Sequence, residues 1–454
     1  MITKQPAKIF IDTKEGVFSA GFGLADITPN IGATSYKDNQ RIPKIYRYTL
    51  AGYGRKRYAR SVHDPLWARA VVFEKGNKRI GIVYLDLIGL HHNHIDNMRK
   101  EIPKELGLDY VIIAATHNHE GPDTLGIWGR GLKSGIRNDY MLILNKKIKE
   151  AFTQAVSNLK PAQISIAQGS IKDLNLTVDL RIPECIPDIL TIIQVKSNDQ
   201  ILGNIIHWEN HPEALGRKNT AITSDFPHFI RQALEEHYKA PAIYWSGALG
   251  GLMAPNPIIT YQGKTYSQGN FDFAETMGRL VADRAIQLVS GAKEINTDQL
   301  KVCNEISQIK TTNFVFKLGS YLGILKRKLF KAKYVESEIA LVCIGNLCLQ
   351  TIPGEIYPEL VYGPIEAPKN ADYPNADKEE PVIIKVMNGK YNLVLGLALD
   401  ELGYIIPENG WDQKKPYLEN DKKKSYGEEL SISIHFAKNL HEIIERLNNL
   451  VKIK

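Results

Sequence analysis

Apolar residues recur along the chain in two patterns, one typical of buried strands and the other of amphipathic helices. Continuous apolar, β-branched runs predict buried strands at 81–88 and 110–115. Further strands are predicted at 161–168, 189–196, 202–208 and 242–245, and Gly345-Asn346 predicts a hairpin turn within 339–351. Helices are predicted at 94–106, 139–158, 225–238, 272–290 and 430–450. This alternation predicts an α/β fold of mixed β-sheets with flanking helices, and no repeat or linker divides residues 1–454.

The composition is that of an ordinary globular protein. The 454 residues are 43% hydrophobic and 24% charged, which excludes disordered and fibrous classes and predicts a sizeable core. The net charge of +7 is mild for this length, and the densest basic runs, 326–328 and 422–424, are short and lack interleaved aromatics. Because such runs are typical of solvated loops, we expect no nucleic-acid partner. The sequence indicates no oligomeric state.

The four cysteines, Cys185, Cys303, Cys343 and Cys348, are too few for a disulfide scaffold and lack metal-binding spacing. Cys343 and Cys348 lie in an apolar run and are predicted to be buried thiols. Residues 1–14 lack the continuous apolar core of a signal peptide, and no stretch is long enough to cross a membrane. We therefore expect a cytoplasmic protein without membrane association.

His117 and His119 lie just past the end of the strand predicted at 110–115. In extended backbone, residues i and i+2 point to the same side, so both imidazoles can face one ion. Strand ends in α/β sheets are where sites form. The pair therefore predicts a catalytic zinc site.

Catalytic zinc usually takes three protein ligands and leaves one position open. A third could come from the end of the strand predicted at 202–208, where both His207 and His211 qualify by residue type. Glu355 follows Pro353-Gly354 and places a carboxylate on a tight turn after another strand. Either histidine, or the carboxylate, could instead be an ordinary hydrogen-bonded or ion-paired residue.

Other catalytic templates fit poorly. The nucleophile elbow GxSxG and the zinc motif HExxH are absent. The glycine-rich turn at 246–251 follows a strand but lacks the Lys-Ser/Thr of a phosphate-binding loop and the GxGxxG fingerprint. Ser246 in this turn is a weak nucleophile candidate.

Six segments resemble the neutral/alkaline ceramidase family, specifically its N-terminal catalytic domain. They are 20–29 (AGFGLADITP), 63–70 (HDPLWARA), 116–122 (THNHEGP), 210–212 (NHP), 353–355 (PGE) and 402–404 (LGY). Together they run over most of the chain, and six motifs in the family's order are more specific than any one of them. The resemblance implies a single ceramidase-like α/β hydrolase domain that acts on a small-molecule amide.

The resemblance also implies roles for individual residues. It places a zinc ion on His117, His211, Glu355 and Tyr404; mixed N/O ligands suit zinc, and the ion can stabilise a tyrosinate. It places His119 beside the reacting carbonyl as an acid or oxyanion donor. It places Arg181 near the substrate, where a fixed cation could stabilise charge.

The segment that carries the family's reactive serine, GDxSPN, departs from the pattern. Here it spans 250–256, with Ala254 in place of the serine, Gly251 in place of the acidic residue and one residue inserted. The nucleophile position is therefore lost, since a methyl group cannot attack. Gly250, Gly251 and Asn256 are still predicted to bind substrate. The family's C-terminal immunoglobulin-like domain is not found, so a small polar amide, ester or lactone is as plausible a substrate as ceramide.

Three functions fit these residues. The first is a zinc-dependent hydrolase in which metal-bound water attacks the carbonyl. The second is a metal-dependent epimerase, isomerase or lyase acting on a small polar substrate, which needs no nucleophile. The third is a non-catalytic binder that has kept the pocket, and the retention of all four implied ligands argues against it.

Residues 313–333 mix aromatic, aliphatic and basic side chains. A basic amphipathic helix at this point could lie on an anionic membrane. Gly319 and Gly323 are predicted to interrupt any helix, which favours an active-site lid or a packed loop.

Overall fold

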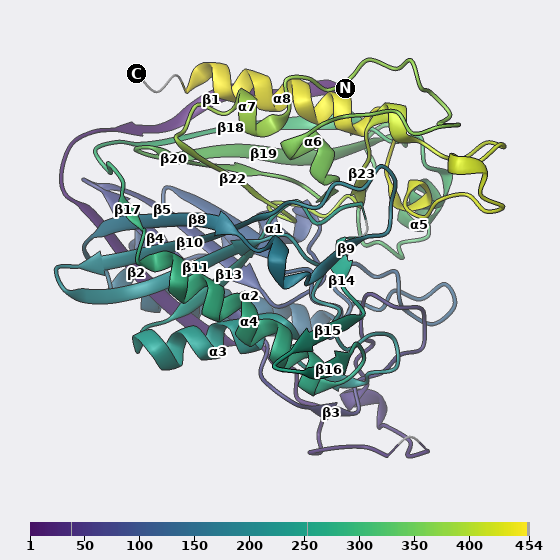
Figure 1. Cartoon of the computed structure of the whole chain (residues 1–454), viewed down its shortest axis with the longest axis horizontal. Coiled ribbons are helices and arrows are strands. Elements are labelled where there is room, and N and C mark those ends of the chain that lie inside the picture. The colour runs from purple at the N-terminus through teal and green to yellow at the C-terminus, as the bar shows by residue number, and fades with distance from the viewer. Residues whose placement is uncertain (38, 252, 452–454) are drawn as a thin grey trace.

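The structure is a computed structural model that describes residues 1–37, 39–251 and 253–451. Three five-stranded sheets form its framework (Figure 1). The first sheet has the order β6 (Tyr110–Ala115), β5 (Lys78–Leu85), β4 (Trp67–Lys75), β2 (Phe18–Asp26), β7 (Lys160–Pro161). The second has the order β13 (Ala242–Ser246), β11 (Gln200–Trp208), β10 (Ile189–Ser197), β8 (Gln163–Ser170), β17 (Lys293–Glu294). The third has the order β1 (Ile2–Thr13), β18 (Leu300–Lys310), β19 (Tyr334–Ile344), β20 (Leu347–Thr351), β22 (Tyr391–Leu395).

Eight α-helices and four short strand pairs complete the described part of the chain. The helices are α1 (His92–Lys100), α2 (Asn138–Ser157), α3 (Phe226–Tyr238), α4 (Phe271–Val289), α5 (Phe314–Tyr321), α6 (Pro358–Tyr362), α7 (Ile383–Val386) and α8 (Phe436–Leu450). The paired short strands are β3 (Ser61–Val62) with β12 (Ala221–Ile222), β9 (Thr177–Asp179) with β14 (Met253–Pro255), β15 (Ile258–Tyr261) with β16 (Lys264–Ser267), and β21 (Glu355–Ile356) with β23 (Tyr404–Ile405).

Each large sheet is mixed in the same way. Most neighbouring strands are antiparallel, and one parallel pair lies at an edge: β5 with β6, β11 with β13, and β20 with β22. The strands of these pairs are rich in β-branched and aliphatic residues and are largely buried, as expected for strands covered on both faces. The predicted α/β fold with mixed sheets and flanking helices is confirmed.

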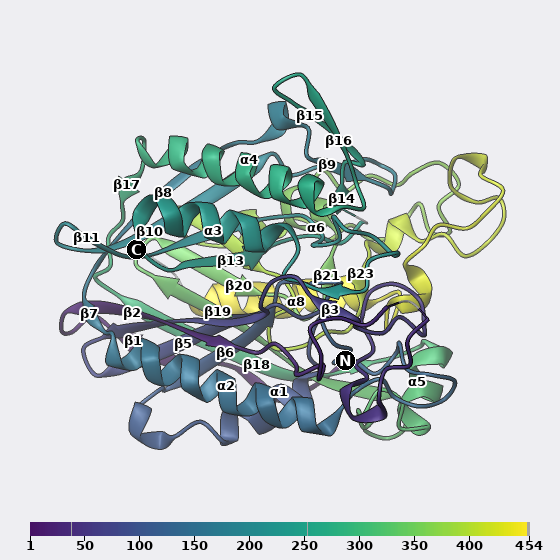
Figure 2. The ribbon, with the colours of Figure 1, turned by 90° about the horizontal axis from the view of Figure 1, so that it is seen from below.

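Helices cover the outer faces of the sheets. α2 packs on β2 and β4, α3 and α4 pack on the second sheet, and α8 packs on the third. Figure 2 shows α3 and α4 on one side of the molecule and α2 on the opposite side, with the sheets between them. The first two sheets face each other so closely that a Cβ added at Gly203 in β11 would lie 2.5 Å from the Phe22 ring of β2. The main apolar core therefore lies between sheets.

Several predicted boundaries are corrected. The strand predicted at 81–88 ends at Leu85. The helix predicted at 94–106 ends at Lys100, because Pro103 cannot continue it, and a separate 3-10 turn follows at Lys104–Leu106. The C-terminal helix begins at Phe436 rather than 430. Five longer strands of the large sheets were not predicted from the sequence: β1, β2, β4, β18 and β22.

Two further predictions are wrong. Cys343 and Cys348 are buried but form a disulfide rather than remaining thiols, because the predicted hairpin places them directly opposite each other on β19 and β20. Gly319 does not interrupt a helix: it lies inside α5, and Gly323, with φ 68°, follows the end of that helix. Within the described residues, no helix combines the length and apolar character needed to span a bilayer.

Candidate metal centre and its cavity

The three sheets bring their parallel edges toward one point, and the candidate ligands follow the carboxyl ends of these strands. His117 lies just after β6, and His211 lies just after β11. Glu355 begins β21, which follows β20, and Tyr404 begins β23, whose register pairs it with Glu355. Carboxyl ends of parallel strands are a common location of ligand sites. Residues more than two hundred positions apart therefore meet in one place.

His117 and His211 are oriented in the same way. The Nδ1 of His117 donates to the carbonyl oxygen of Ile88 at 2.8 Å, and the Nδ1 of His211 donates to that of Met253 at 2.8 Å. Each Nε2 is thereby left facing Glu355, whose Oε2 lies 3.3 Å from the Nε2 of His117 and 3.1 Å from that of His211. Fixing one imidazole nitrogen on a carbonyl is the usual way in which proteins orient metal-binding histidines.

The spacing of these donors fits one small cation. Two ligands about 2.0–2.1 Å from a tetrahedral zinc ion lie about 3.3–3.4 Å apart. The Nε2–Oε2 distances of 3.3 and 3.1 Å are close to that value. The nitrogens of His117, His119 and His211 also lie within 4.8 Å of one another, and all three rings are buried. Nitrogen with carboxylate oxygen is a donor set that suits zinc.

The electrostatic surroundings of Glu355 agree with a cation-binding role. Burial alone would favour a neutral Glu355. The positive charges of His117 and His211, together with the hydrogen bonds that they form with the carboxyl group, instead hold its pKa well below its usual range. Burial would lower the pKa of His211, but the hydrogen bond with Glu355 and the charges of Glu213 and Glu355 raise it. The carboxylate thus stands in an environment that favours its charged form.

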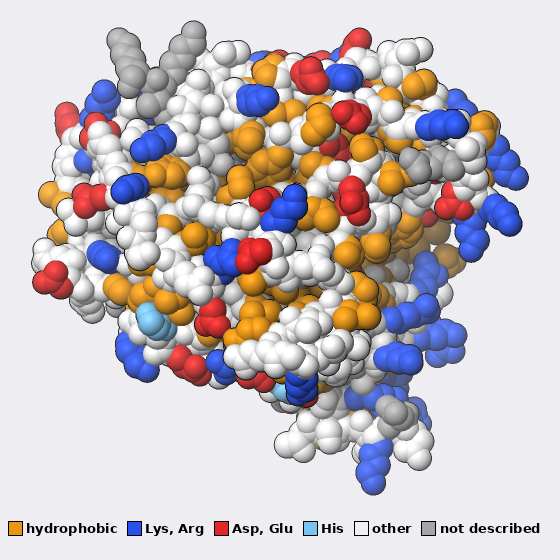
Figure 3. Space-filling model, in the orientation of Figure 1, with side chains coloured by type: hydrophobic (Ala, Val, Ile, Leu, Met, Phe, Trp, Pro, Cys, Tyr) orange, Lys and Arg blue, Asp and Glu red, His pale blue; other side chains and the backbone are white. Residues whose placement is uncertain are grey.

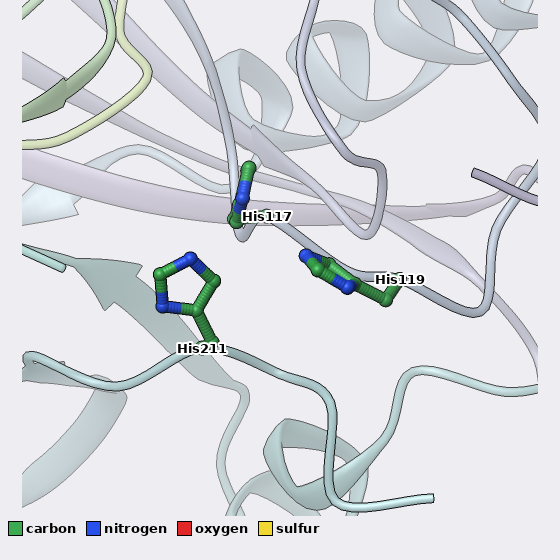
Figure 4. Close-up of side chains that lie close together, drawn as sticks. All are labelled: His117, His119 and His211. Atoms are coloured by element: carbon green, nitrogen blue, oxygen red, sulfur yellow. The ribbon is translucent and has the colours of Figure 1, made fainter. Parts of the chain in front are cut away.

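Figure 4 shows the imidazoles of His117, His119 and His211 close together, and His119 differs from the other two in its hydrogen bonds. It is only 8% exposed, yet neither ring nitrogen has a hydrogen-bond partner among the described residues. The nearest carboxylate oxygen, Oε2 of Glu213, lies 3.5 Å from its Nδ1, and the ring of Tyr53 packs edge-on against it. Burial, followed by the neighbouring His117 and His211, lowers the pKa of His119 well below its ordinary value. A neutral imidazole with free ring nitrogens is suited to contact a substrate.

Two further ionisable groups border the donors. Burial, followed by the negative charge of Glu355, raises the pKa of the Tyr404 hydroxyl well above its usual value. The same two causes raise the pKa of Glu401, whose Oε1 accepts a hydrogen bond from the backbone N–H of Gly403 and whose Oε2 is unpaired. Burial and the charge of Glu355 thus favour the neutral form of both groups, and ionisation of Tyr404 would require a nearby cation.

The loop that carries His117 is strained and firmly held. His117 has a φ of 67°, a conformation that non-glycine residues adopt rarely and that persists where surrounding contacts enforce it. Asn118 donates to the carbonyl oxygens of Asp86 and Thr223 at 3.2 and 2.8 Å. The carboxylate of Asp86 forms a buried bidentate ion pair with Arg231, at 2.7 and 2.9 Å. This pair fixes the segment that also presents the Ile88 carbonyl to His117.

The donors lie at the side of a cavity of about 780 Å³. Its wall is mostly aliphatic and aromatic, with residues from the 88–132 region, from α5 and its following loop, and from 402–430. Among the described residues that line it, there is no Ser, Thr, Cys or Lys. The cavity therefore combines a metal-binding corner with a large apolar volume and offers none of these common nucleophilic side chains.

Some residues predicted for the site lie elsewhere. Arg181 does not line the cavity: its guanidinium is paired with Glu428 at 2.7 Å and donates to the carbonyl oxygens of Gly410 and Tyr426 at 2.6 and 3.1 Å. It stacks over Tyr357 as well. Because Leu180 and Tyr426 do line the cavity, Arg181 holds two parts of the cavity wall together from behind.

The segment around the lost nucleophile position also serves the scaffold. Gly250 donates from its backbone N–H to Ile356 at 2.8 Å, and a Cβ at this position would lie 2.5 Å from the Glu355 carbonyl oxygen. Gly251 has a φ of 70°, and Asn256 donates to Asn175 at 3.0 Å. Ala254 is buried in β14 opposite Val178. None of these four is among the described residues that line the cavity.

Two sequence candidates have structural partners. The Nε2 of His207 donates to the carbonyl oxygen of Val394 at 2.7 Å, so this histidine stands outside the donor cluster. The hydroxyl of Ser246 donates to the carbonyl oxygen of Ala115 at 2.9 Å and is fully buried. Residue type alone left both histidines open, and the structure brings His211, the one that the resemblance implied, to the donor cluster.

The sequence did not single out Tyr53, Glu213 or Glu401. The Tyr53 hydroxyl donates to the Glu213 carboxylate at 3.0 Å, beside His119. Two of the three adjoin motifs: Glu213 comes two residues after His211, and Glu401 comes three before Tyr404. For Glu213 and Glu401, closeness in the sequence to a predicted ligand was therefore a signal that could have identified them as residues of the site.

Comparisons with known proteins bear on the fold. No protein-family model matches the chain, and neither does any curated protein sequence. Among solved structures, neutral ceramidase from Pseudomonas aeruginosa superposes with a TM-score of 0.71 at 14% identity, over 96% of this chain and 75% of that one. A ceramidase complexed with C2 matches equally well, over 96% of this chain and 76% of the other. The chain therefore has the fold of neutral ceramidase, as the motif resemblance predicted.

Proposed function

We propose that this protein is a metal-dependent hydrolase that cleaves an acyl amide whose acyl portion is a long apolar chain. The observation that carries the proposal is the convergence of His117, His211 and Glu355 beside an apolar cavity of about 780 Å³. The fold shared with neutral ceramidase supports an amide over other carbonyl compounds. The apolar wall favours a hydrocarbon chain over the small polar substrate considered from the sequence.

In this proposal, the metal is zinc and its ligands are His117, His211 and Glu355, joined by Tyr404. Bound there, a zinc ion supplies Lewis acidity toward the substrate carbonyl and acidifies water. The protein's part is to hold the two histidines in fixed positions, through the carbonyls of Ile88 and Met253, before the ion arrives.

Water is the nucleophile in this scheme, since the described cavity wall offers no Ser, Thr, Cys or Lys. Neutral His119 accepts the proton of the attacking water on one ring nitrogen. It then delivers a proton to the leaving nitrogen, so that amide and water yield a carboxylic acid and an amine. Glu213, 3.5 Å from Nδ1 of His119, is placed to stabilise the imidazolium that forms between these two transfers.

The apolar wall contributes binding and excludes solvent. An acyl chain that enters the cavity releases water from Leu, Ile and Val side chains and places its carbonyl beside the donors. Excluding water from the surroundings of the carbonyl also strengthens the electrostatic interactions there.

The test follows an N-acyl amide in water enriched in oxygen-18, with metal content measured on the same preparation. We expect about one zinc per chain and one labelled oxygen in the released acid. His211→Ala should lose the metal while keeping the wild-type circular dichroism spectrum, and the exposed His237→Ala should keep the metal. An unlabelled product, or full activity in metal-free protein, would exclude metal-dependent hydrolysis.

A further inference from the structure

Several residues that line the cavity are apolar and largely exposed to solvent, and we call the side of the cavity that they form its mouth. Leu132, Leu180 and Val315 line the cavity and are 70%, 66% and 68% exposed. Leu318 and Tyr426 also line it and are about half exposed. Exposed apolar residues are usually scattered singly, and a contiguous group marks a surface that contacts another apolar phase.

Helix α5 supplies most of this surface. Its first and last turns carry Phe314 and Tyr321, which are 72% and 88% exposed and are not among the described residues that line the cavity. Exposed apolar residues on this helix are spaced three or four positions apart, so they share one side of it. They are Phe314, Val315, Leu318 and Tyr321, and Leu322 follows directly after the helix. The opposite side is anchored, since Phe316 packs on the core under the third sheet.

Both ends of the α5 segment are held in place. Asn313 accepts from the backbone N–H of Phe316 at 2.9 Å and donates to the carbonyl oxygens of Glu429 and Ser431 at 2.8 Å each. Beyond the helix, Arg327 forms a buried ion pair with Asp400, Nη2 to Oδ2, at 2.7 Å. The apolar side of α5 is thus presented outward by a fixed frame, and its exposure does not come from a loose loop.

Basic residues accompany the apolar ones. Arg130 and Lys133 flank the exposed Leu132, Lys317 lies on α5, and Lys326 and Lys328 follow it. In the part of the chain that the structure describes, none of these five forms an ion pair. Figure 3 shows Lys and Arg side chains gathered along the side of the molecule where α5 lies in Figure 1.

From this juxtaposition we propose that α5 and the cavity mouth dock on an anionic lipid bilayer. Phe314, Val315, Leu318 and Tyr321 enter the acyl boundary, and Arg130, Lys133, Lys317 and Lys328 contact anionic headgroups. This is the arrangement expected of an amphipathic helix that lies in the interface plane. Docking in this orientation opens the cavity directly toward the lipid. Binding does not require catalysis, so the inference stands independently of the proposed hydrolase activity.

The experiment measures co-sedimentation of the full-length protein with two kinds of vesicle. One is pure phosphatidylcholine and the other is phosphatidylcholine mixed with phosphatidylglycerol. We expect stronger binding to the anionic vesicles, with affinity that falls as salt is added. The double variant Phe314→Ser/Tyr321→Ser should bind these vesicles about tenfold more weakly. Removing Lys317 and Lys328 should weaken binding about fivefold per charge.

Matched controls separate docking from general surface effects. Leu142→Ser/Ile258→Ser removes two exposed apolar residues from α2 and β15, and Lys146→Ala/Lys239→Ala removes two exposed charges. Both controls should bind like the wild type, and all four variants should keep its thermal unfolding midpoint.

Three results would overturn the proposal. The first is an equal loss of binding in variants and controls. The second is equal binding to the neutral and the anionic vesicles. The third is a concentration-dependent dimer, seen by sedimentation velocity without lipid and abolished by Phe314→Ser/Tyr321→Ser, which would mean that a second copy of the chain covers this surface.

Discussion

The apolar wall of the cavity predicts how activity depends on the length of the acyl chain. The perturbation is a series of N-acyl amides with one fixed chromogenic amine and acyl groups lengthened one methylene at a time. The wall that receives this chain includes Ile88, Leu125 and Leu402, all nearly fully buried. Every added methylene therefore leaves water for an apolar surface.

The magnitude follows from the transfer free energy of a methylene group. Burial of one CH₂ is worth about 0.8 kcal/mol, which corresponds to a factor of about four in kcat/KM. Four methylenes should then raise kcat/KM about 200-fold. The rise should stop when the chain fills the available cavity volume of about 780 Å³, which lies within the range found for ligand pockets.

The assay records initial rates below the micelle concentration of each amide, so that kcat/KM reports the free substrate. Ile324→Trp adds volume to the cavity wall and should shift the optimum to shorter chains. Ile258→Trp is the matched control, because Ile258 is exposed on β15 and does not line the cavity. A value of kcat/KM that is flat from acetyl to long acyl chains would refute the assignment of the cavity to an acyl chain.

Three further predictions concern individual residues. Glu355→Gln should weaken zinc binding by more than about 100-fold, because even the residues that only orient metal ligands account for losses of up to about 100-fold. Competition with a chelator measures the affinity, and an unchanged affinity would show that Glu355 is not a ligand. His119→Gln should keep the zinc and reduce kcat by about 10²–10⁴-fold, and a proportional loss of metal would instead make His119 a ligand. Arg231→Met should destabilise the protein by about 3–5 kcal/mol in urea unfolding, because it leaves Asp86 charged, buried and unpaired. Its control, Glu275→Gln, breaks a half-exposed ion pair with Arg279 and should change the free energy of unfolding by less than about 1 kcal/mol.

Hydrophobic periodicity predicted the fold class, five of the helices and the most continuously apolar strands, but it missed strands such as β2, β4 and β18. The runs at 110–115 and 242–245 are buried on both faces, so their apolar pattern is unbroken and their strands are found where expected. Two helix ends were misplaced: Pro103 was a local signal for the end of α1 that the hydrophobic pattern outweighed, whereas α8 begins at Phe436 without a side-chain cap that could have marked it. Gly319 was misread because intrinsic propensity costs only about 1 kcal/mol, and the anchors at Asn313 and Arg327 outweigh it.

Local spacing in the sequence predicted the His117 and His119 pair, but it could not predict which distant residues join them in the candidate site. His117 and His119 were recognised from their separation of two residues, although the backbone between them is not the extended strand that this reasoning assumed. His117 has a φ of 67°, and the two rings nevertheless lie 5.0 Å apart, centroid to centroid. His207 and His211 remained equivalent, since the choice between them depends on Val394 and Met253, which lie far away in sequence. The same holds for Arg181, whose partner Glu428 is 247 positions distant. Contacts of that range are set by the packing of whole sheets and leave no local pattern.

The segment in which Ala254 stands where the resemblance implies a serine still orients a donor of the candidate metal site. Met253 accepts from both the Nδ1 and the backbone N–H of His211, at 2.8 and 2.9 Å, through its carbonyl oxygen. That carbonyl belongs to the backbone of β14, where Ala254 pairs with Val178 in an antiparallel register. A backbone acceptor does not depend on the side chain of the next residue, so an alanine at 254 leaves the position of His211 unaffected. The absence of a serine hydroxyl at 254 therefore removes a potential attacking group but leaves the donors in place. Under the proposed function, water can then act as the nucleophile instead of that hydroxyl.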